Sequence, residues 1–288
     1  MSLKLGPFFS ITKSCLLVLW LQLIFITIHA QPKKDMRTAF FPILEKRPNQ
    51  LPDKKHVWVF IMAGQSNMAG RAQVEGADTI PNPRILTINK AGEIILAKEP
   101  LHFYEPTMAG LDCGMSFANA LLTDVPADVS ILLIPTAVGG SSIIKWINDS
   151  VHRSVPLFSN FKEKVQIAKQ YGRIKGILWH QGEADANEMY MPVYFDQMTK
   201  LFSVFRKTCG NKKLPIILGE LGSFSLTAGK QFAQVNAIMR QYVDSDPHSA
   251  LVEMGKYGHR GDNLHFNAEG ERGLGKGYAK AFAEKFLH

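Results

Sequence analysis

Residues 57–68, VWVFIMAGQSNM, join a continuous apolar run to a short polar turn. The run is rich in β-branched and aromatic residues and has no polar alternation, which is typical of a strand covered on both faces. Similar apolar runs follow at residues 129–135, 174–179, 214–219 and 250–254. The sequence therefore predicts several buried strands, the first of which ends directly at a polar cluster.

Patterns of amphipathic helices lie between these runs. Apolar residues recur at helical spacing in two segments, namely Tyr194, Met198, Leu201, Phe202 and Phe205, and then Phe232, Val235, Ile238, Met239 and Tyr242. Strands that alternate with helices imply right-handed crossovers and a mainly parallel sheet between helical layers. The sequence thus predicts one α/β domain over residues 56–288, with ligands bound at the carboxyl ends of its strands.

The first 30 residues have the pattern of a secretory signal peptide. Lys4 and Lys13 precede an uncharged apolar stretch at residues 15–28, and the small residue Ala30 follows it. The stretch is shorter than the roughly 20 apolar residues that a membrane-spanning helix needs. We therefore expect a mature chain that begins near Gln31, is exported to a periplasmic or extracellular location and has no stable membrane insertion.

The segment at residues 31–55 contains four prolines and shows no sustained periodicity. We expect it to be an N-terminal leader without chemistry. The full chain carries a net charge of +8, and loss of Lys4 and Lys13 with the signal peptide leaves +6. These charges are scattered along the chain rather than gathered in one basic element, so we expect no nucleic-acid partner.

Two cysteines, Cys113 and Cys209, remain after removal of the signal peptide. Export makes a disulfide chemically possible, but a bridge requires Cα atoms within roughly 7 Å of each other. Nothing in the surrounding sequence brings these residues together. We expect two buried thiols, and a bridge is the alternative.

Three polar clusters each follow a predicted strand: GQSNM at residues 64–68, GGSS at 139–142 and HQGE at 180–183. Any one of them is explained by the turn that joins a strand to a helix. Three clusters are expected to meet, because the carboxyl ends of parallel strands lie at one edge of the sheet. Their coincidence favours a functional site at that edge.

A fourth polar segment, DNLHFN at residues 262–267, precedes a C-terminal helix for which Asn267 is a suitable N-cap. Asp262 and His265 are three residues apart. This spacing allows the carboxylate to bond one imidazole nitrogen, fix the tautomer and leave the other nitrogen facing a nucleophile from another loop. Alone, such a pair is more often a surface contact. A catalytic role for it is favoured here because the three polar clusters are expected at the same site.

The motifs GQSNM, VGGSSIIKW, WHQGEAD and DNLHFNAEG, in this order from residue 64 to residue 270, resemble those of the SGNH hydrolases. The resemblance is closest to the branch that contains sialate O-acetylesterase-like and acetylxylan esterase enzymes. It implies a flavodoxin-like three-layer α/β/α sandwich. It also implies that Ser66 is the nucleophile, His265 the general base and Asp262 the acid that orients it.

By the same resemblance, the oxyanion hole comprises three donors: the backbone N–H of Ser66, a backbone N–H of the pair Gly139 and Gly140, and the side-chain amide of Gln181. Of the two glycines, we choose Gly140. Loss of one such donor typically raises a barrier by about 2.7–4 kcal/mol. Gln181 stands where the wider superfamily usually has asparagine.

Gln65 also departs from the superfamily pattern, because it stands where an aspartate usually precedes the nucleophile. Both departures belong to the acetylesterase-like branch. We expect Gln65, Asn67 and Gly139 to support the site or bind substrate. Glu183 has the same expected role, and it is also the alternative to Asp262 as the acid of the triad.

These features predict a secreted serine esterase that removes O-acetyl groups from carbohydrate through an acyl-enzyme. The alternatives are a lipase-type or thioesterase-type SGNH hydrolase and a glycan-binding relative without activity. The sequence lacks a GxSxG elbow, which argues against the α/β-hydrolase fold. His56, His180 and His259 lack the spacing of metal ligands, so we expect neither a metal nor another cofactor.

Overall fold

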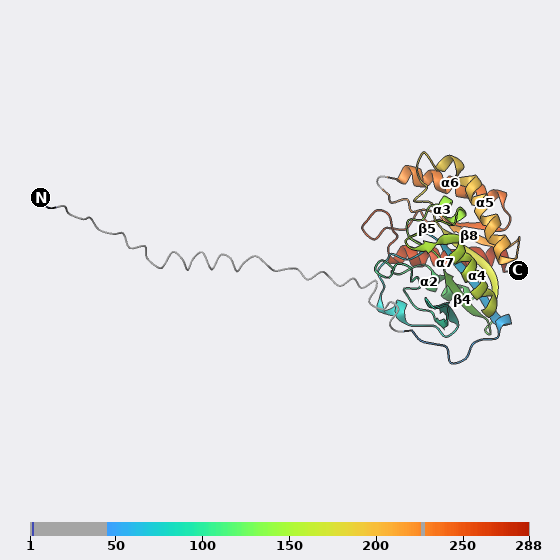
Figure 1. The fold of residues 1–288 in the computed structure, drawn as a ribbon. Coiled ribbons are helices and arrows are strands. Elements are labelled where there is room, and N and C mark those ends of the chain that lie inside the picture. Colours follow the sequence, from blue (N-terminus) through green and yellow to red (C-terminus); the bar gives the residue numbers. More distant parts are fainter. Residues whose placement is uncertain (1, 3–44, 226–227, 288) are drawn as a thin grey trace. The chain divides into compact units, whose positions relative to one another are not determined.

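The computed structural model describes residues 2, 45–225 and 228–287 (Figure 1). Apart from residue 2, the expected signal peptide and residues 31–44 of the expected leader lie outside the described residues. The elements in chain order are η2 (Lys54–His56), β1 (Val57–Gly64), η3 (Gly76–Thr79), β2 (Ile85–Ile88), β3 (Ile94–Leu96), α2 (Gly114–Leu121), β4 (Ser130–Pro135), α3 (Ile143–Ile147), β5 (Val151–His152), β6 (Val155–Pro156), α4 (Leu157–Tyr171), β7 (Arg173–His180), α5 (Met191–Cys209), β8 (Ile216–Gly219), α6 (Gly229–Ser245), β9 (Ser249–Val252) and α7 (Ala268–Phe286).

The main sheet has seven strands in the order β3-β2-β4-β1-β7-β8-β9. All neighbouring strands from β2 to β9 in this order are parallel. The five strands β4-β1-β7-β8-β9 follow the 2-1-3-4-5 order of flavodoxin-like folds, in which ligands bind where the strand order reverses. The predicted mainly parallel sheet is confirmed, and its reversal point lies beside β1 and β7.

Two apolar cores cover the two faces of the sheet. In β1, Val59 and Ile61 contribute to the core that contains residues of α3, α4, α5 and α6, whereas Phe60 and Met62 contribute to the core with α2 and α7. Side chains of a strand alternate between faces, so an apolar residue at every position requires a helical layer on each side. This confirms the expected three-layer α/β/α arrangement.

The sequence reasoning did not identify β2 and β3, which extend the sheet beyond β4. β3 runs antiparallel to β2 in a hairpin, with Leu86 opposite Leu96. Both strands are short and no helix separates them, so they break the strand–helix alternation on which the prediction relied. They widen the sheet on the side away from the reversal point.

The C-terminal helix α7 begins as expected, because the Asn267 side chain accepts a hydrogen bond from the Gly270 N–H. Cys113 and Cys209 are both buried free thiols, which confirms the preferred expectation. In the described part of the chain, no helix has the length and apolar character needed to cross a membrane.

Candidate active site

The three polar clusters that follow β1, β4 and β7 meet at one edge of the sheet, as expected. The Gln65 N–H donates to the His180 carbonyl at 2.9 Å, which joins the turns after β1 and β7. The Val138 N–H donates to the Gly64 carbonyl at 3.2 Å, which joins the ends of β1 and β4. The parallel order of the strands therefore brings residues far apart in sequence into one site.

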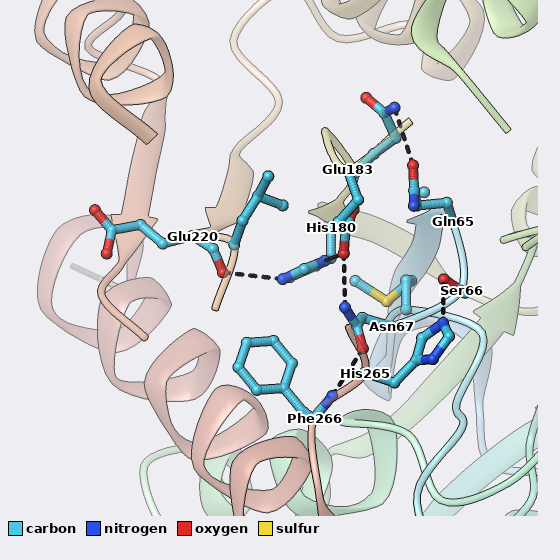
Figure 2. Close-up of polar contacts among 12 residues, drawn as sticks. Gln65, Ser66, Asn67, His180, Glu183, Glu220, His265 and Phe266 are labelled. Carbon is cyan, nitrogen blue, oxygen red and sulfur yellow. Dashed lines mark hydrogen bonds and ion pairs between the residues drawn. The ribbon is translucent and has the colours of Figure 1, made fainter. Parts of the chain in front are cut away.

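Ser66, His265 and Asp262 form a continuous hydrogen-bonded chain. His265 Nε2 lies 2.9 Å from Ser66 Oγ (Figure 2). On the other side of the ring, Nδ1 lies 2.7 Å from Asp262 Oδ2. A carboxylate can only accept, so it selects the tautomer with hydrogen on Nδ1 and leaves Nε2 free to accept the serine proton. Chemically, this geometry allows Ser66 to act as a nucleophile, His265 as its base and Asp262 as the acid that orients the base.

The turn that carries Asp262 holds this geometry through its backbone. Asp262 Oδ1 accepts from the N–H groups of Leu264 at 3.0 Å and His265 at 2.8 Å. Partial burial works to raise the pKa of Asp262, but the hydrogen bonds from the His265 N–H, the His265 ring and the Leu264 N–H outweigh it and hold the pKa at about 2. The acid is therefore charged throughout the neutral range.

Arg260 adds a second tether to this turn, which sequence reasoning missed. Its Nε lies 3.2 Å from Asp262 Oδ2, and its Nη1 donates to the Arg71 carbonyl at 2.6 Å. No sequence pattern pairs Arg260 with Asp262 or with the Arg71 carbonyl, so the sequence offered no signal for these contacts.

Glu183, the alternative acid, lies elsewhere. Its Oε1 accepts from Asn67 Nδ2 at 2.6 Å and lies 3.7 Å from His180 Nδ1. Within the part of the chain that the structure describes, no hydrogen bond or ion pair joins Glu183 to His265. Asp262 alone is therefore placed to orient the imidazole.

The glycine pair after β4 leaves one N–H available. The Gly139 N–H donates to Glu105 Oε2 at 2.6 Å, whereas the Gly140 N–H has no acceptor among the described residues. Lys145 Nζ, a donor, lies 3.1 Å from His152 Nδ1, so His152 Nε2 carries the hydrogen and donates to the Gly139 carbonyl at 2.9 Å. The carbonyl and N–H of one trans peptide point in opposite directions. The His152 contact therefore fixes how the Gly140 N–H points.

The Gln181 side-chain amide is already hydrogen-bonded within the protein, unlike a donor that is free to serve the oxyanion hole. It is fully buried, and its Nε2 donates to Asp185 and also lies 3.2 Å from Gln65 Oε1 and 3.3 Å from the Ser141 carbonyl. Its Oε1 accepts from Tyr194 at 3.0 Å. The amide thus ties the turns after β1 and β4 together. A direct role in the hole requires one of these bonds to open and stays a prediction.

Sequence reasoning also missed a cation beside the glycine pair. Arg153 and Ser154 join β5 to β6 with φ values of 48° and 64°, the backbone pattern of a tight hairpin turn. Arg153 pairs with Glu105, and a Cβ placed on Gly140 would lie 3.8 Å from Arg153 Nη2. Such turns usually contain glycine or asparagine, and neither residue stands here.

Glu105 is the centre of this charged group. Burial works to raise the pKa of Glu105. Arg71, the Gly139 N–H and Arg153 together lower this pKa by more than burial raises it, so the net shift is downward. Glu105 and Arg71 are both almost completely buried and lie 2.8 Å apart. Residues 45–225 and 228–287 contain no group of three or more His, Cys, Asp or Glu side chains that could hold a metal ion.

Known proteins match both the sequence and the fold. The family model for "carbohydrate esterase, sialic acid-specific acetylesterase" matches residues 56–284. A probable carbohydrate esterase of Arabidopsis thaliana is 28% identical over 248 residues, which covers 79% of this chain and 91% of that protein. An X-ray structure of an Arabidopsis thaliana protein has a TM-score of 0.70 at 27% identity, covering 80% of this chain and 98% of that chain.

A crystal structure of a carbohydrate acetylesterase from Xanthomonas citri has a TM-score of 0.61 at 20% identity, over 81% of this chain and 57% of that chain. At this identity the likeness supports the fold alone. The family model, in contrast, covers most of the chain. The chain therefore belongs to the carbohydrate esterase family of the sialic acid-specific acetylesterases, which are carboxylic ester hydrolases.

Proposed function

We propose that this protein removes O-acetyl groups from carbohydrate through an acyl-enzyme on Ser66. The observation that carries the proposal is the chain of two contacts, 2.9 Å from Ser66 Oγ to His265 Nε2 and 2.7 Å from His265 Nδ1 to Asp262. A serine hydroxyl is a weak nucleophile until a neighbouring base accepts its proton. Here the base lies within hydrogen-bond distance and in the required tautomer.

In the first half-reaction, Ser66 Oγ attacks the acetyl carbonyl carbon while its proton moves to His265 Nε2. Negative charge develops on the carbonyl oxygen, and the backbone N–H groups of Ser66 and Gly140 are the donors available to it. When the tetrahedral intermediate collapses, the bond to the sugar oxygen breaks and His265 gives that oxygen its proton. The products are the free sugar hydroxyl and acetyl-Ser66.

The second half-reaction repeats these steps with water. His265 removes a proton from water, the hydroxide attacks the acetyl carbon, and Ser66 Oγ leaves with the proton from His265. Acetate is released and the enzyme returns to its initial state. Asp262 keeps its charge throughout and stabilises the imidazolium in both half-reactions.

The direct test replaces Ser66 by alanine. Ser66→Ala should abolish acetate release and keep the melting temperature close to that of the wild type, because alanine removes only the hydroxyl with its contact to His265. A serine-directed organophosphonate should label Ser66 in the wild-type protein and nothing in the variant. Labelling of another serine, or substantial activity in the variant, would contradict the acyl-enzyme.

Among acetylated sugars, Arg153 supports an acidic one such as sialic acid over neutral xylan. Its Nη1 is engaged with Glu105, and its Nη2 lies on the side of Gly140, beside the candidate oxyanion hole. Arg153→Gln should therefore lower kcat/KM for O-acetyl sialic acid and leave that for acetylated xylo-oligosaccharides unchanged. Arg173→Gln, an exposed change at the opposite end of β7, is the matched control. Equal effects on both substrates would remove this support.

The signal-peptide pattern of residues 1–30 supports export, which we also propose. Sequencing the N-terminus of the protein purified from its source should find a first residue near Gln31. A retained Met1 would exclude processing.

A further inference from the structure

Asn67, which directly follows the nucleophile, contacts the backbone on both sides of His265. Its Oδ1 accepts from the Phe266 N–H at 3.1 Å (Figure 2). Its Nδ2 lies 3.4 Å from the Leu264 carbonyl. The side chain is almost completely buried. One amide therefore holds the peptide groups before and after the catalytic base, and it does so from the residue next to Ser66.

Glu183 determines which way this amide points. Its carboxylate accepts from Asn67 Nδ2 at 2.6 Å, and its side chain is 4% exposed. A carboxylate offers acceptors and the Phe266 N–H offers a donor, so both neighbours require the same orientation of the amide. The flipped amide would place oxygen against the carboxylate and NH₂ against the Phe266 N–H. Two buried polar mismatches thus exclude it.

The turn at residues 258–266 needs such an anchor. It contains Gly261 with φ 112° and Asn263 with φ 56°, and among the described residues the Asp262 carboxylate bonds only groups within this turn. Asp262 consequently sets the tautomer and rotamer of His265 but does not fix the turn relative to Ser66. Arg260 connects the turn to this loop further along the chain, at Arg71, and the Asn67 amide connects it directly beside Ser66.

We propose that Glu183 is a positioning residue that holds the Asn67 amide, and through it the His265 turn, in register with Ser66. This inference rests on the triad proposed above and removes Glu183 from consideration as a second triad acid. Misplacement of a reacting group by about 1 Å typically costs about 100-fold in rate. The role therefore predicts a loss in kcat, while KM changes little.

A pair of variants that exchanges donor and acceptor tests the contact. Asn67→Asp keeps the acceptor for the Phe266 N–H but places a carboxylate oxygen about 2.6 Å from Glu183, so kcat should fall by about 100-fold. Glu183→Gln keeps an acceptor for Asn67 and should cost less than about tenfold. In the double variant, the amide introduced at position 183 donates to the carboxylate introduced at position 67, and kcat should rise at least about tenfold above that of Asn67→Asp.

The measurements are kcat and KM for an acetyl ester, the rate of organophosphonate labelling of Ser66, and the melting temperature. The labelling rate reports the reactivity of Ser66 without dependence on sugar binding and should follow kcat through the series. Glu188→Gln, an exposed change on the same loop, is the matched control. Recovery in the double variant supports the inference, and a double variant no faster than Asn67→Asp would overturn it.

Should Asn67→Asp fail to fold, Glu183→Ala provides an independent test. Removal of the carboxylate leaves the amide without its orienting acceptor, so kcat and the labelling rate should both fall by about tenfold with KM unchanged. Wild-type values of both would overturn the inference. A wild-type protein that neither hydrolyses acetyl esters nor is labelled at Ser66 would instead refute the proposed function, so the two failures are distinguishable.

Discussion

Asp262→Asn is the change that most sharply tests the triad, because asparagine has two ways to occupy the site. In one orientation, its oxygen replaces Oδ1 and keeps the hydrogen bonds from the Leu264 and His265 N–H groups, 3.0 Å and 2.8 Å in length. Its NH₂ group then faces His265 Nδ1. Nδ1 must accept, so the hydrogen moves to Nε2 and the ring can no longer take the Ser66 proton.

In the flipped orientation, the oxygen faces His265 Nδ1 and keeps the active tautomer. The NH₂ group then faces the two backbone N–H groups, and both hydrogen bonds are lost. At about 1 kcal/mol for each bond, the flipped form is less stable by about 2 kcal/mol and holds roughly 1 in 30 molecules. The loss of activity should therefore be at least about 30-fold. It should approach the roughly 10⁴-fold, or about 5 kcal/mol, found for the equivalent change in a protease triad.

The assay is kcat for acetate release from an alkyl acetate, whose leaving group needs the proton that His265 returns. Circular dichroism should show a folded variant. Glu183→Gln, measured beside it, should lose less than about tenfold. A loss below tenfold for Asp262→Asn would refute the tautomer argument, and a larger loss for Glu183→Gln would move the acid role to Glu183.

Three further outcomes follow from the site. Gly140→Ala should lower kcat by about 100-fold or more, because a φ of 72° strains alanine and displaces the N–H. The variant should still fold, since the added Cβ meets its nearest neighbours only at 3.8 Å. An unchanged kcat would exclude this N–H from the hole. Gln181→Leu should mainly lower the melting temperature, and a folded variant with kcat reduced 100-fold would instead restore Gln181 as a direct donor. Asp262 has a pKa of about 2, below its ordinary 3.8, so its contribution to stability is complete above about pH 4 and is lost as the pH falls towards 2. The stability of the wild type relative to Asp262→Asn in urea unfolding should shrink over that window, and a constant difference would contradict the shift.

Much of this fold could be predicted because its signals are local in sequence. The apolar run that begins at Val57 requires cover on both faces, and the alternation of such runs with helical patterns leads to a parallel sheet. The contact between Asp262 and His265 was equally accessible, because both atoms belong to one short turn. Ser66, the proposed nucleophile, could be placed with them only because parallel strands end at a common edge and the motif order resembles a known superfamily.

The remaining parts of the site depend on distances that no sequence pattern encodes. Glu105 reaches Gly139 from a long loop without regular structure, and Arg153 arrives on a hairpin that lacks the usual turn residues. Gln181 was correctly placed at the end of a strand, but its orientation depends on Asp185, which accepts from its Nε2, and on Tyr194, which donates to its Oε1. Spacing along a chain identifies which loop carries a side chain. The hydrogen-bond partners of that side chain decide which of its donors and acceptors remain available for chemistry.

The contacts between loops suggest why this site resides on strand ends rather than on a single segment. The proposed nucleophile Ser66, the candidate hole residue Gly140 and the proposed base His265 lie on separate loops. Buried polar side chains connect these loops: Gln181 joins the turns after β1 and β4, and Asn67 joins the Ser66 loop to the His265 turn. Buried amides of this kind are costly when unpaired, so each connection has few acceptable arrangements. The sheet fixes where the loops start, and the amides fix where they meet. A change to the Asn67 amide should therefore alter kcat through geometry, although it removes none of the proposed reacting groups.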